Sequence, residues 1–210
     1  MPVTLKDGTL LKDIHRVIIC TGYHISYPFL SHLHSDFTNP EDADNTVLVT
    51  DGTMVHNLHR DIFYIPDPSL AFVGTSYYTA TFTLFEFQSI AVAAVFSAKA
   101  LLPSKTTMEK EYLGKLKSKG FGRSFHSLKE EQKEYVAGLV GWINEDAQKT
   151  GAETVEGHTA QWLQEEKLIM IKMKKMFENK AAMEKLGEGD KELKGPWKVE
   201  RSAETLIAAA

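Results

Sequence analysis

The chain has 210 residues, of which 43% are hydrophobic and 25% are charged, and its formal net charge is -4. This composition is typical of a folded protein with one good core, and the mild negative charge gives no electrostatic reason to expect nucleic acid or an anionic membrane surface as a partner. The single cysteine, Cys20, excludes an intrachain disulfide and favours a reducing compartment, so we expect a cytoplasmic protein.

The first predicted element is a β-hairpin. Asp7-Gly8 separates the extended runs 3–5 and 9–11, and an Asp-Gly pair accepts the positive φ of a tight turn at low cost. A chain that opens on a hairpin, without a preceding strand and Gly-rich turn, resembles the continuation of an enzyme more than its start. No basic region followed by an apolar stretch opens the chain, so no secretory signal is expected.

A short buried strand is predicted for residues 17–20, and it ends at Thr21, Gly22 and Tyr23. A glycine at the carboxyl end of a strand lets a ligand approach the backbone, and hydroxyls beside it can position polar groups. A tight turn with a packed tyrosine explains the same three residues and is favoured on them alone. Cys20 ends an apolar strand, so we expect it in the core and not as a nucleophile.

Residues 24–68 are rich in turn formers and histidines. Asp51-Gly52 predicts a second hairpin, residues 63–65 a further short extended run, and residues 27–30 an aromatic lid. Four histidines lie close enough along the chain for a zinc site to be considered, but without a cysteine pair or a His-Glu-x-x-His helix, surface and hydrogen-bonding roles are favoured. These histidines are His32, His34, His56 and His59.

The most informative stretch is the uncharged run 70–75, which is followed by a predicted helix over 83–102. Such a run resembles a buried parallel strand that delivers a ligand-binding turn at Gly74 and Thr75. A Ser/Thr-x-x-Glu capping box is predicted at Thr83, and the free N–H groups at a helix start favour an anionic or electron-rich ligand. A core strand with its crossover helix and no ligand explains the run about equally well. The apolar run 89–102 is shorter than the roughly 18 to 20 residues of a membrane span.

Helices dominate after Pro103. Capping boxes at residues 106–109 and 127–130 predict helices near 108–119 and 128–149, and residues 158–186 predict one long helix. The second of these carries an apolar stripe that we expect to pack on the preceding domain. The Met-rich stripe of the long helix is more simply a core or docking face than a partner or substrate-access surface. The stripe of the second helix is Tyr135, Leu139, Trp142 and Ile143.

We therefore expect three parts. Residues 1–104 form the first domain, residues 105–186 a helical extension that packs on it, and residues 187–210 a charged, flexible tail.

Five short blocks occur in a specific order and spacing. They are Cys20-Thr21-Gly22-Tyr23, Tyr27-Pro28-Phe29-Leu30, Ile65-Pro66-Asp67-Pro68-Ser69-Leu70-Ala71-Phe72-Val73-Gly74, Glu86-Phe87-Gln88 and Leu101-Leu102-Pro103-Ser104. Together they resemble the carboxyl-terminal half of flavin-containing monooxygenases, most closely the fungal kind. The resemblance covers about residues 3–103 and continues faintly through 125–128 and 135–142. The family usually has alanine where this chain has Cys20.

This resemblance implies an α/β fold class: a partial Rossmann-like FAD/NAD(P)-binding fold with a mixed sheet, followed by a helical carboxyl-terminal region. It implies FAD and NADPH as cofactors. Thr21, Gly22 and Tyr23 would match the linker strand between the family's two dinucleotide-binding domains. Gly74 and Thr75, with the helix that carries Gln88, would match the segment along the flavin ring and ribityl chain. No residue is identified as catalytic.

Members of the family reduce FAD with NADPH, form a flavin hydroperoxide with dioxygen, and insert one oxygen atom into a soft nitrogen or sulfur nucleophile. Both of their Gly-x-Gly-x-x-Gly turns precede the matched region, and neither motif occurs in this chain. Two hypotheses follow. The chain is a portion of such an enzyme, acting on a small molecule together with a missing amino-terminal half, or it is a non-catalytic truncated remnant that binds a full-length relative as an interaction or regulatory module.

Overall fold

The computed structural model describes residues 2–18, 20, 22–35 and 39–185. Contacts divide the chain into two compact units, residues 1–157 and 158–210. The first unit includes the two helices that lie between residues 105 and 150, because they share core clusters with earlier residues. The three-part division expected from the sequence stays a prediction, and its tail, 187–210, lies outside the described residues.

Strands are short in the described residues. β1 (Val3–Thr4) and β2 (Leu10–Leu11) form the expected antiparallel hairpin, and β3 (Leu58–His59) and β4 (Phe63–Tyr64) form a second antiparallel pair. The Asp51-Gly52 turn is accompanied by a single antiparallel bridge between Val49 and Val55 and not by two full strands. Helices with small sheets agree with the α/β class in its coarse form, and the Rossmann-like organisation stays a prediction.

Two predicted buried strands are wrong. Val17 and Ile18 are 58% and 83% exposed, and Cys20, expected in the core, is exposed. In the 70–75 run, Ala71 makes one antiparallel bridge to Phe63, not the parallel pairing expected. A buried parallel strand needs parallel neighbours to pair with its backbone hydrogen-bonding groups, and the described residues supply no parallel neighbour for either run.

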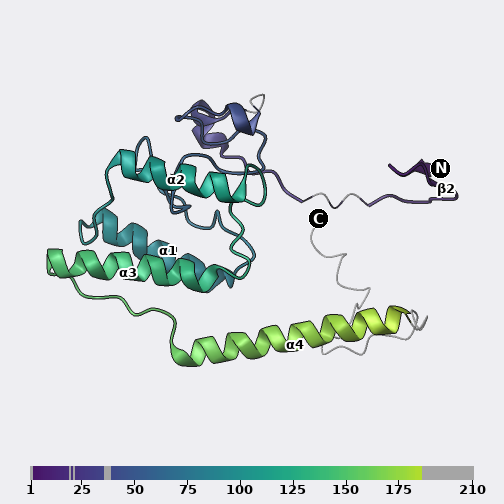
Figure 1. Ribbon diagram of the computed structural model, residues 1–210. Helices are drawn as coiled ribbons and strands as arrows, with labels where there is room; N and C mark the ends of the chain where they lie inside the picture. The colour runs from purple at the N-terminus through teal and green to yellow at the C-terminus, as the bar shows by residue number, and fades with distance from the viewer. Residues whose placement is uncertain (1, 19, 21, 36–38, 186–210) are drawn as a thin grey trace, which may run out of the picture. The chain divides into compact units, whose positions relative to one another are not determined.

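The described part of the chain holds four α-helices: α1 (Thr81–Phe96), α2 (Lys105–Lys119), α3 (Gln132–Thr150) and α4 (Ala160–Lys185) (Figure 1). Two 3-10 helices precede them, η1 (Pro28–Leu33) and η2 (Pro40–Asp42). The predicted helices are confirmed, but their predicted caps are wrong, because α1 and α2 begin earlier and α3 later than the capping-box pattern suggests. Ser104 caps α2 by accepting the N–H of Thr107. The N-cap residues of α1 and α3, which are Ala80 and Glu131, make no side-chain capping bond. None of the helices in the described residues is long and apolar enough to span a membrane.

The main core lies between α1 and α3, which run side by side in Figure 1. Leu84 and Ala91 from α1 pack with Leu139 and Ile143 from α3, so the predicted apolar stripe of α3 is confirmed. Each leucine or isoleucine side chain that is fully buried in this way contributes about 1.5 to 3 kcal/mol. Phe63 of β4 is fully buried in the same cluster, which places the β3–β4 hairpin against these helices.

Two smaller clusters complete the unit. One joins β3 and β4 to residues near η1, where the ring of Tyr27 packs 4.9 Å from that of Phe72. The other joins α2, through Met108 and Tyr112, to Phe125. This second contact brings α2 and the loop before α3 close to the β3–β4 hairpin.

Candidate functional site

The candidate site lies where the loop before α1 meets that helix. The N–H of Gly74 donates to Oε1 of Gln88 at 2.9 Å, and Gln88 is fully buried. The other end of the amide, Nε2, donates to the hydroxyl of Tyr135 at 3.0 Å, and that hydroxyl donates to the carbonyl of Arg60 at 2.6 Å. Since both ends of the amide have partners, its orientation is fixed. The structure thus brings two residues predicted from the sequence, Gly74 and Gln88, into direct contact.

A glycine is required at position 74 by the backbone conformation there and by a neighbouring side chain. Its φ is +92°, in the region that favours glycine, and an added Cβ would lie 2.9 Å from Cζ of Phe85. The turn therefore places its backbone against the first turns of α1 with no room for a side chain.

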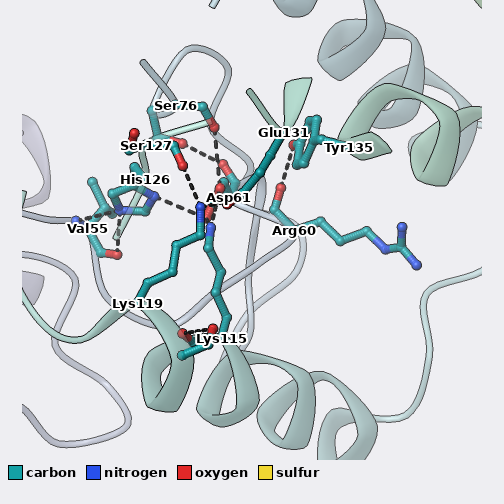
Figure 2. A network of polar contacts seen from close by, with 12 residues as sticks. Val55, Arg60, Asp61, Ser76, Lys115, Lys119, His126, Ser127, Glu131 and Tyr135 are labelled. Carbon is teal, nitrogen blue, oxygen red and sulfur yellow. Dashed lines mark hydrogen bonds and ion pairs between the residues drawn. The ribbon is translucent and has the colours of Figure 1, made fainter. Parts of the chain in front are cut away.

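The next two residues are tied to Asp61. Thr75 donates its hydroxyl hydrogen to the carbonyl of Asp61 at 2.7 Å, and Ser76 donates to the carboxylate at 3.3 Å. The same carboxylate, 1% exposed, receives Nζ of Lys115 from α2 at 2.5 and 2.6 Å and lies 3.0 Å from Nδ1 of His126 (Figure 2). We call Asp61, Lys115 and His126 the Asp61 centre.

Asp61 is ionised at neutral pH. Burial by itself raises the pKa of Asp61, but the hydrogen bond and charge of His126, together with those of Lys115, outweigh burial and lower the pKa to about 2. Burial and the charge of Asp61 raise the pKa of Tyr135, so its hydroxyl keeps its proton and can donate to Arg60. The charged groups of the Asp61 centre are already paired with one another. The centre is therefore suited to holding the backbone in place and not to exchanging protons.

The other predicted residues lie elsewhere. Thr21 is outside the described residues. Gly22 has a φ of +82°, and an added Cβ would lie 3.2 Å from Nη1 of Arg123, which also donates to the carbonyl of Tyr23 at 3.1 Å. The Tyr23 side chain is 94% exposed, so the alternative of a packed tyrosine is wrong. Gly22 and Tyr23 therefore meet Arg123 and not the Asp61 centre.

The amino terminus of α1 is open. Its N-cap is Ala80, which offers no side-chain acceptor, and the N–H groups of Phe82 and Thr83 have no hydrogen-bond acceptor among the described residues. Large side chains beside this end are exposed, including Val73 at 46%, Tyr78 at 71% and Phe82 at 91%. Free N–H groups and the helix dipole favour an electron-rich group at this position.

The four histidines considered for zinc have other positions. In the described residues, no three His, Cys, Asp or Glu side chains are grouped as a metal site would require. His56 bonds Thr50 through Nε2 at 2.9 Å. Burial lowers the pKa of His56 and of His59 to about 4, so the ring of His59 is neutral at pH 7 although it lies 3.5 Å from the Glu111 carboxylate. His32 lies in η1 and His34 follows it.

A cavity of about 560 Å³ opens beside the Asp61 centre. Charges of both signs line it, several of them already paired, as Lys119 is with Glu131 at 2.5 Å. Its lining includes Arg60, Asp61, Glu111, Lys115, Lys119 and Tyr135.

Sequence reasoning did not identify Asp61 or Lys115. For Asp61 the available signal was a charged residue between two short strands, a place where turn chemistry alone already explains an aspartate. His126 and Tyr135 fell in the faint part of the resemblance, His126 without an assigned role and Tyr135 only as part of an apolar stripe. Only the long-range contacts join these residues to Gly74 and Thr75.

No family model matches the chain. The chain is 43% identical over 174 residues to flavin-containing monooxygenase ustF2 of Aspergillus flavus, across 82% of this chain and 35% of that protein. It is 61% identical over 123 residues to flavin-containing monooxygenase ustF1 of the same species, across 59% of this chain and 31% of that protein. The thiol-specific monooxygenase of Saccharomyces cerevisiae is 31% identical over 118 residues, 53% of this chain and 25% of that protein.

Among solved structures, an S-allyl-L-cysteine S-oxygenase from Allium sativum overlaps 74% of this chain and 32% of its own chain, with a TM-score of 0.49 and 26% identity. The overlap is too partial to establish the fold. The chain spans between 31% and 35% of the length of the two Aspergillus relatives.

Proposed function

The chain belongs to the flavin-containing monooxygenase family, of the fungal type, and from that premise we propose that it is a carboxyl-terminal portion of an FAD- and NADPH-dependent monooxygenase. The proposed enzyme uses dioxygen to oxygenate a small molecule with a soft nitrogen or sulfur nucleophile. The identity of 61% over 123 residues with a relative named as a flavin-containing monooxygenase supports this assignment. The use of a single cysteine supports a cytoplasmic location.

The observation that carries the proposal is the bond between Gly74 and Gln88 at the open end of α1. A glycine turn followed by uncapped N–H groups fits the electron-rich edge of a flavin. In the proposal, Gln88 holds the turn, Thr75 follows it along the ligand, and the N–H groups of Phe82 and Thr83 stabilise negative charge. When bound, the flavin supplies the oxygen-transfer chemistry.

These residues fit only one end of the cofactor. No Gly-x-Gly-x-x-Gly motif occurs in the sequence, so no residues of this chain are assigned to the pyrophosphate of FAD or NADPH. We infer that an amino-terminal dinucleotide-binding portion, which the family resemblance implies, supplies that cradle. The exposed apolar side chains of Val73, Tyr78 and Phe82 beside the turn are the surface that we expect this portion to cover.

The test is a fusion of this chain to the amino-terminal portion of the 61% identical relative, in place of the relative's own matching region. We expect the purified fusion to retain FAD at one molecule per chain and to oxidise NADPH faster when an amine or sulfide substrate is added. The chain alone, mixed with FAD and passed through a desalting column, should retain much less. A folded fusion that holds no FAD would contradict the proposal and would favour the non-catalytic remnant.

A further inference from the structure

The β3–β4 hairpin turns through two residues in the left-handed backbone conformation. Arg60 and Asp61 have φ values of +54° and +59°, and the turn is closed by the N–H of Ile62, which donates to the carbonyl of His59 at 3.0 Å. Glycine, asparagine and aspartate adopt this region readily but arginine does not, so the strain of the turn lies at Arg60. A turn of this kind persists when surrounding contacts hold it.

The contacts that hold this turn come from three separate parts of the chain. Lys115 reaches the Asp61 carboxylate from α2, His126 from the loop before α3, and Ser76 from the segment after Gly74 (Figure 2). His126 is itself fixed, because its Nε2 lies 3.0 Å from the nitrogen and 3.1 Å from the oxygen of Val55. The carboxylate therefore has a defined position as well as a charge.

Both backbone carbonyls of the turn, those of Arg60 and Asp61, also accept hydrogen bonds. The carbonyl of Asp61 accepts from Thr75, and that of Arg60 accepts from Tyr135, the residue that holds the far end of the Gln88 amide. The turn thus contacts the 74–76 segment directly through Asp61 and indirectly through Tyr135 and Gln88.

We propose that Asp61 is a positioning residue for the 74–76 segment: its carboxylate, fixed by Lys115 and His126, sets where Thr75 and Ser76 stand and so which backbone groups meet the flavin. The inference rests on the proposed function. A buried ion pair contributes little net stability compared with well-packed apolar residues, but it specifies geometry. The strained turn and the paired charges are accounted for together if the geometry of residues 74–76 is what they maintain.

The experiment compares Asp61→Asn, which keeps the shape but removes the charge, with Asp67→Asn. Asp67 is a matched control because its carboxylate, like that of Asp61, accepts a hydrogen bond from a serine, in this case Ser69 in a local turn. Unlike Asp61, Asp67 is exposed and lies away from the Asp61 centre. In the full chain without cofactor, we expect D61N to raise hydrogen exchange about tenfold at the amides of residues 74–78 that have acceptors, Gly74 and Tyr77, while amides of α1 and α3 keep their protection. D67N should leave these amides unchanged.

A second readout concerns the cofactor. In the fusion protein, D61N should weaken FAD binding about tenfold and change the visible circular dichroism of the bound flavin, whereas D67N should do neither. If exchange of residues 74–78 is unchanged in D61N, the proposal is overturned whatever happens to FAD. It is also overturned if exchange rises while flavin affinity and dichroism stay as in the parent protein.

Two further comparisons cover the cases in which D61N unfolds the chain or the parent fusion holds no FAD. If D61N unfolds the chain, Asp61→Asn combined with Lys115→Met removes both charges of this ion pair and restores folding. Faster exchange of residues 74–78 in that folded variant supports the proposal, and unchanged exchange overturns it. If exchange rises as expected but the parent fusion holds no FAD, the proposed function fails while the positioning of the segment by Asp61 stands.

Discussion

Gln88 accepts the backbone N–H of Gly74 at 2.9 Å across 14 residues of chain. This single bond fastens the loop before α1 to the second turn of the same helix. Because the N–H of Gly74 is occupied, the groups left to meet a ligand are those that follow it, at residue 75 and at the uncapped start of α1. Gln88 therefore acts on a ligand through Gly74.

Replacing Gln88 by leucine should destabilise the chain by about 2 to 4 kcal/mol, since the hydroxyl of Tyr135 and the N–H of Gly74 both lose a partner. Tyr135→Phe should cost about 1 to 3 kcal/mol for the same reason. The double variant should lose less than the sum, because the two residues share a bond. Urea unfolding measures all three. Tyr23→Phe, at an exposed tyrosine, is the control and should change nothing measurable.

Gly74→Ala should destabilise the chain by about 2 to 4 kcal/mol, because it adds a strained φ to a clash with the ring of Phe85. Combining it with Phe85→Leu should recover the part due to the clash and leave the part due to the backbone. Gly114→Ala is the matched control: Gly114 lies within α2 with open space around it, so this change should stabilise by about 0.5 to 1 kcal/mol. Thermal unfolding distinguishes the two glycines, and equal effects at both would contradict the steric argument.

Stability should fall as the pH drops from 6.5 towards 4. Burial lowers the pKa of His56 and His59 to about 4 in the folded chain, whereas both titrate at 6.5 when unfolded. Between these values the unfolded chain binds more protons, so their stabilising contribution is complete above pH 6.5 and is lost as the pH falls through 4. Near pH 5 unfolding should take up roughly one extra proton for each of the two histidines. Urea unfolding at a series of pH values gives this number.

The matched control for this pH dependence is His15→Gln, at an exposed histidine, which should leave the profile unchanged. His59→Gln should remove about one proton from the uptake. A further loss of stability is expected as the pH falls from 3.8 to 2, because the pKa of Asp61 is lowered to about 2 by its hydrogen bonds and charged partners. A flat profile between pH 6.5 and 4 would show that the two histidines are not buried as described.

Removing residues 158–210 should leave the melting temperature of the first unit within about 2 °C of the parent value. The core clusters described above are formed by residues before that point, the last being Val155. Ending the chain at residue 152 should instead cost about 1 to 3 kcal/mol, because Val155 and its two hydrogen bonds to Asn144 are lost. Circular dichroism during heating measures both truncations.

The helices could be predicted from the sequence and the strands largely could not. Helical spacing over many residues identified α3 and α4 nearly in full, because the apolar face is repeated several times. The runs at 17–20 and 70–75 are too short for that, and a run of four to six apolar residues does not reveal whether neighbouring strands exist to pair with it. Val73, for example, is 46% exposed although it sits in the most apolar stretch.

The candidate site was predictable where its parts are local. The local pattern predicted a ligand-binding turn at Gly74 and Thr75 before a helix, and the family resemblance added the part of that helix that carries Gln88. Asp61 contacts Lys115 and His126, which come from distant parts of the chain, and no local sequence pattern predicts such contacts. Tyr135 was assigned to an apolar stripe, and its ring does pack there, but its hydroxyl serves Gln88 and Arg60.

The turn at Arg60 and Asp61 also bears on the order in which the chain folds. Its backbone conformation is locally unfavourable, and its stabilising partners Lys115 and His126 are 54 and 65 residues further along. Hairpins with favourable turns form early in folding, whereas this hairpin is stabilised only after α2 and the loop before α3 have packed against it. We therefore expect the β3–β4 hairpin, and with it the ordering of residues 74–76, to be among the last events of folding.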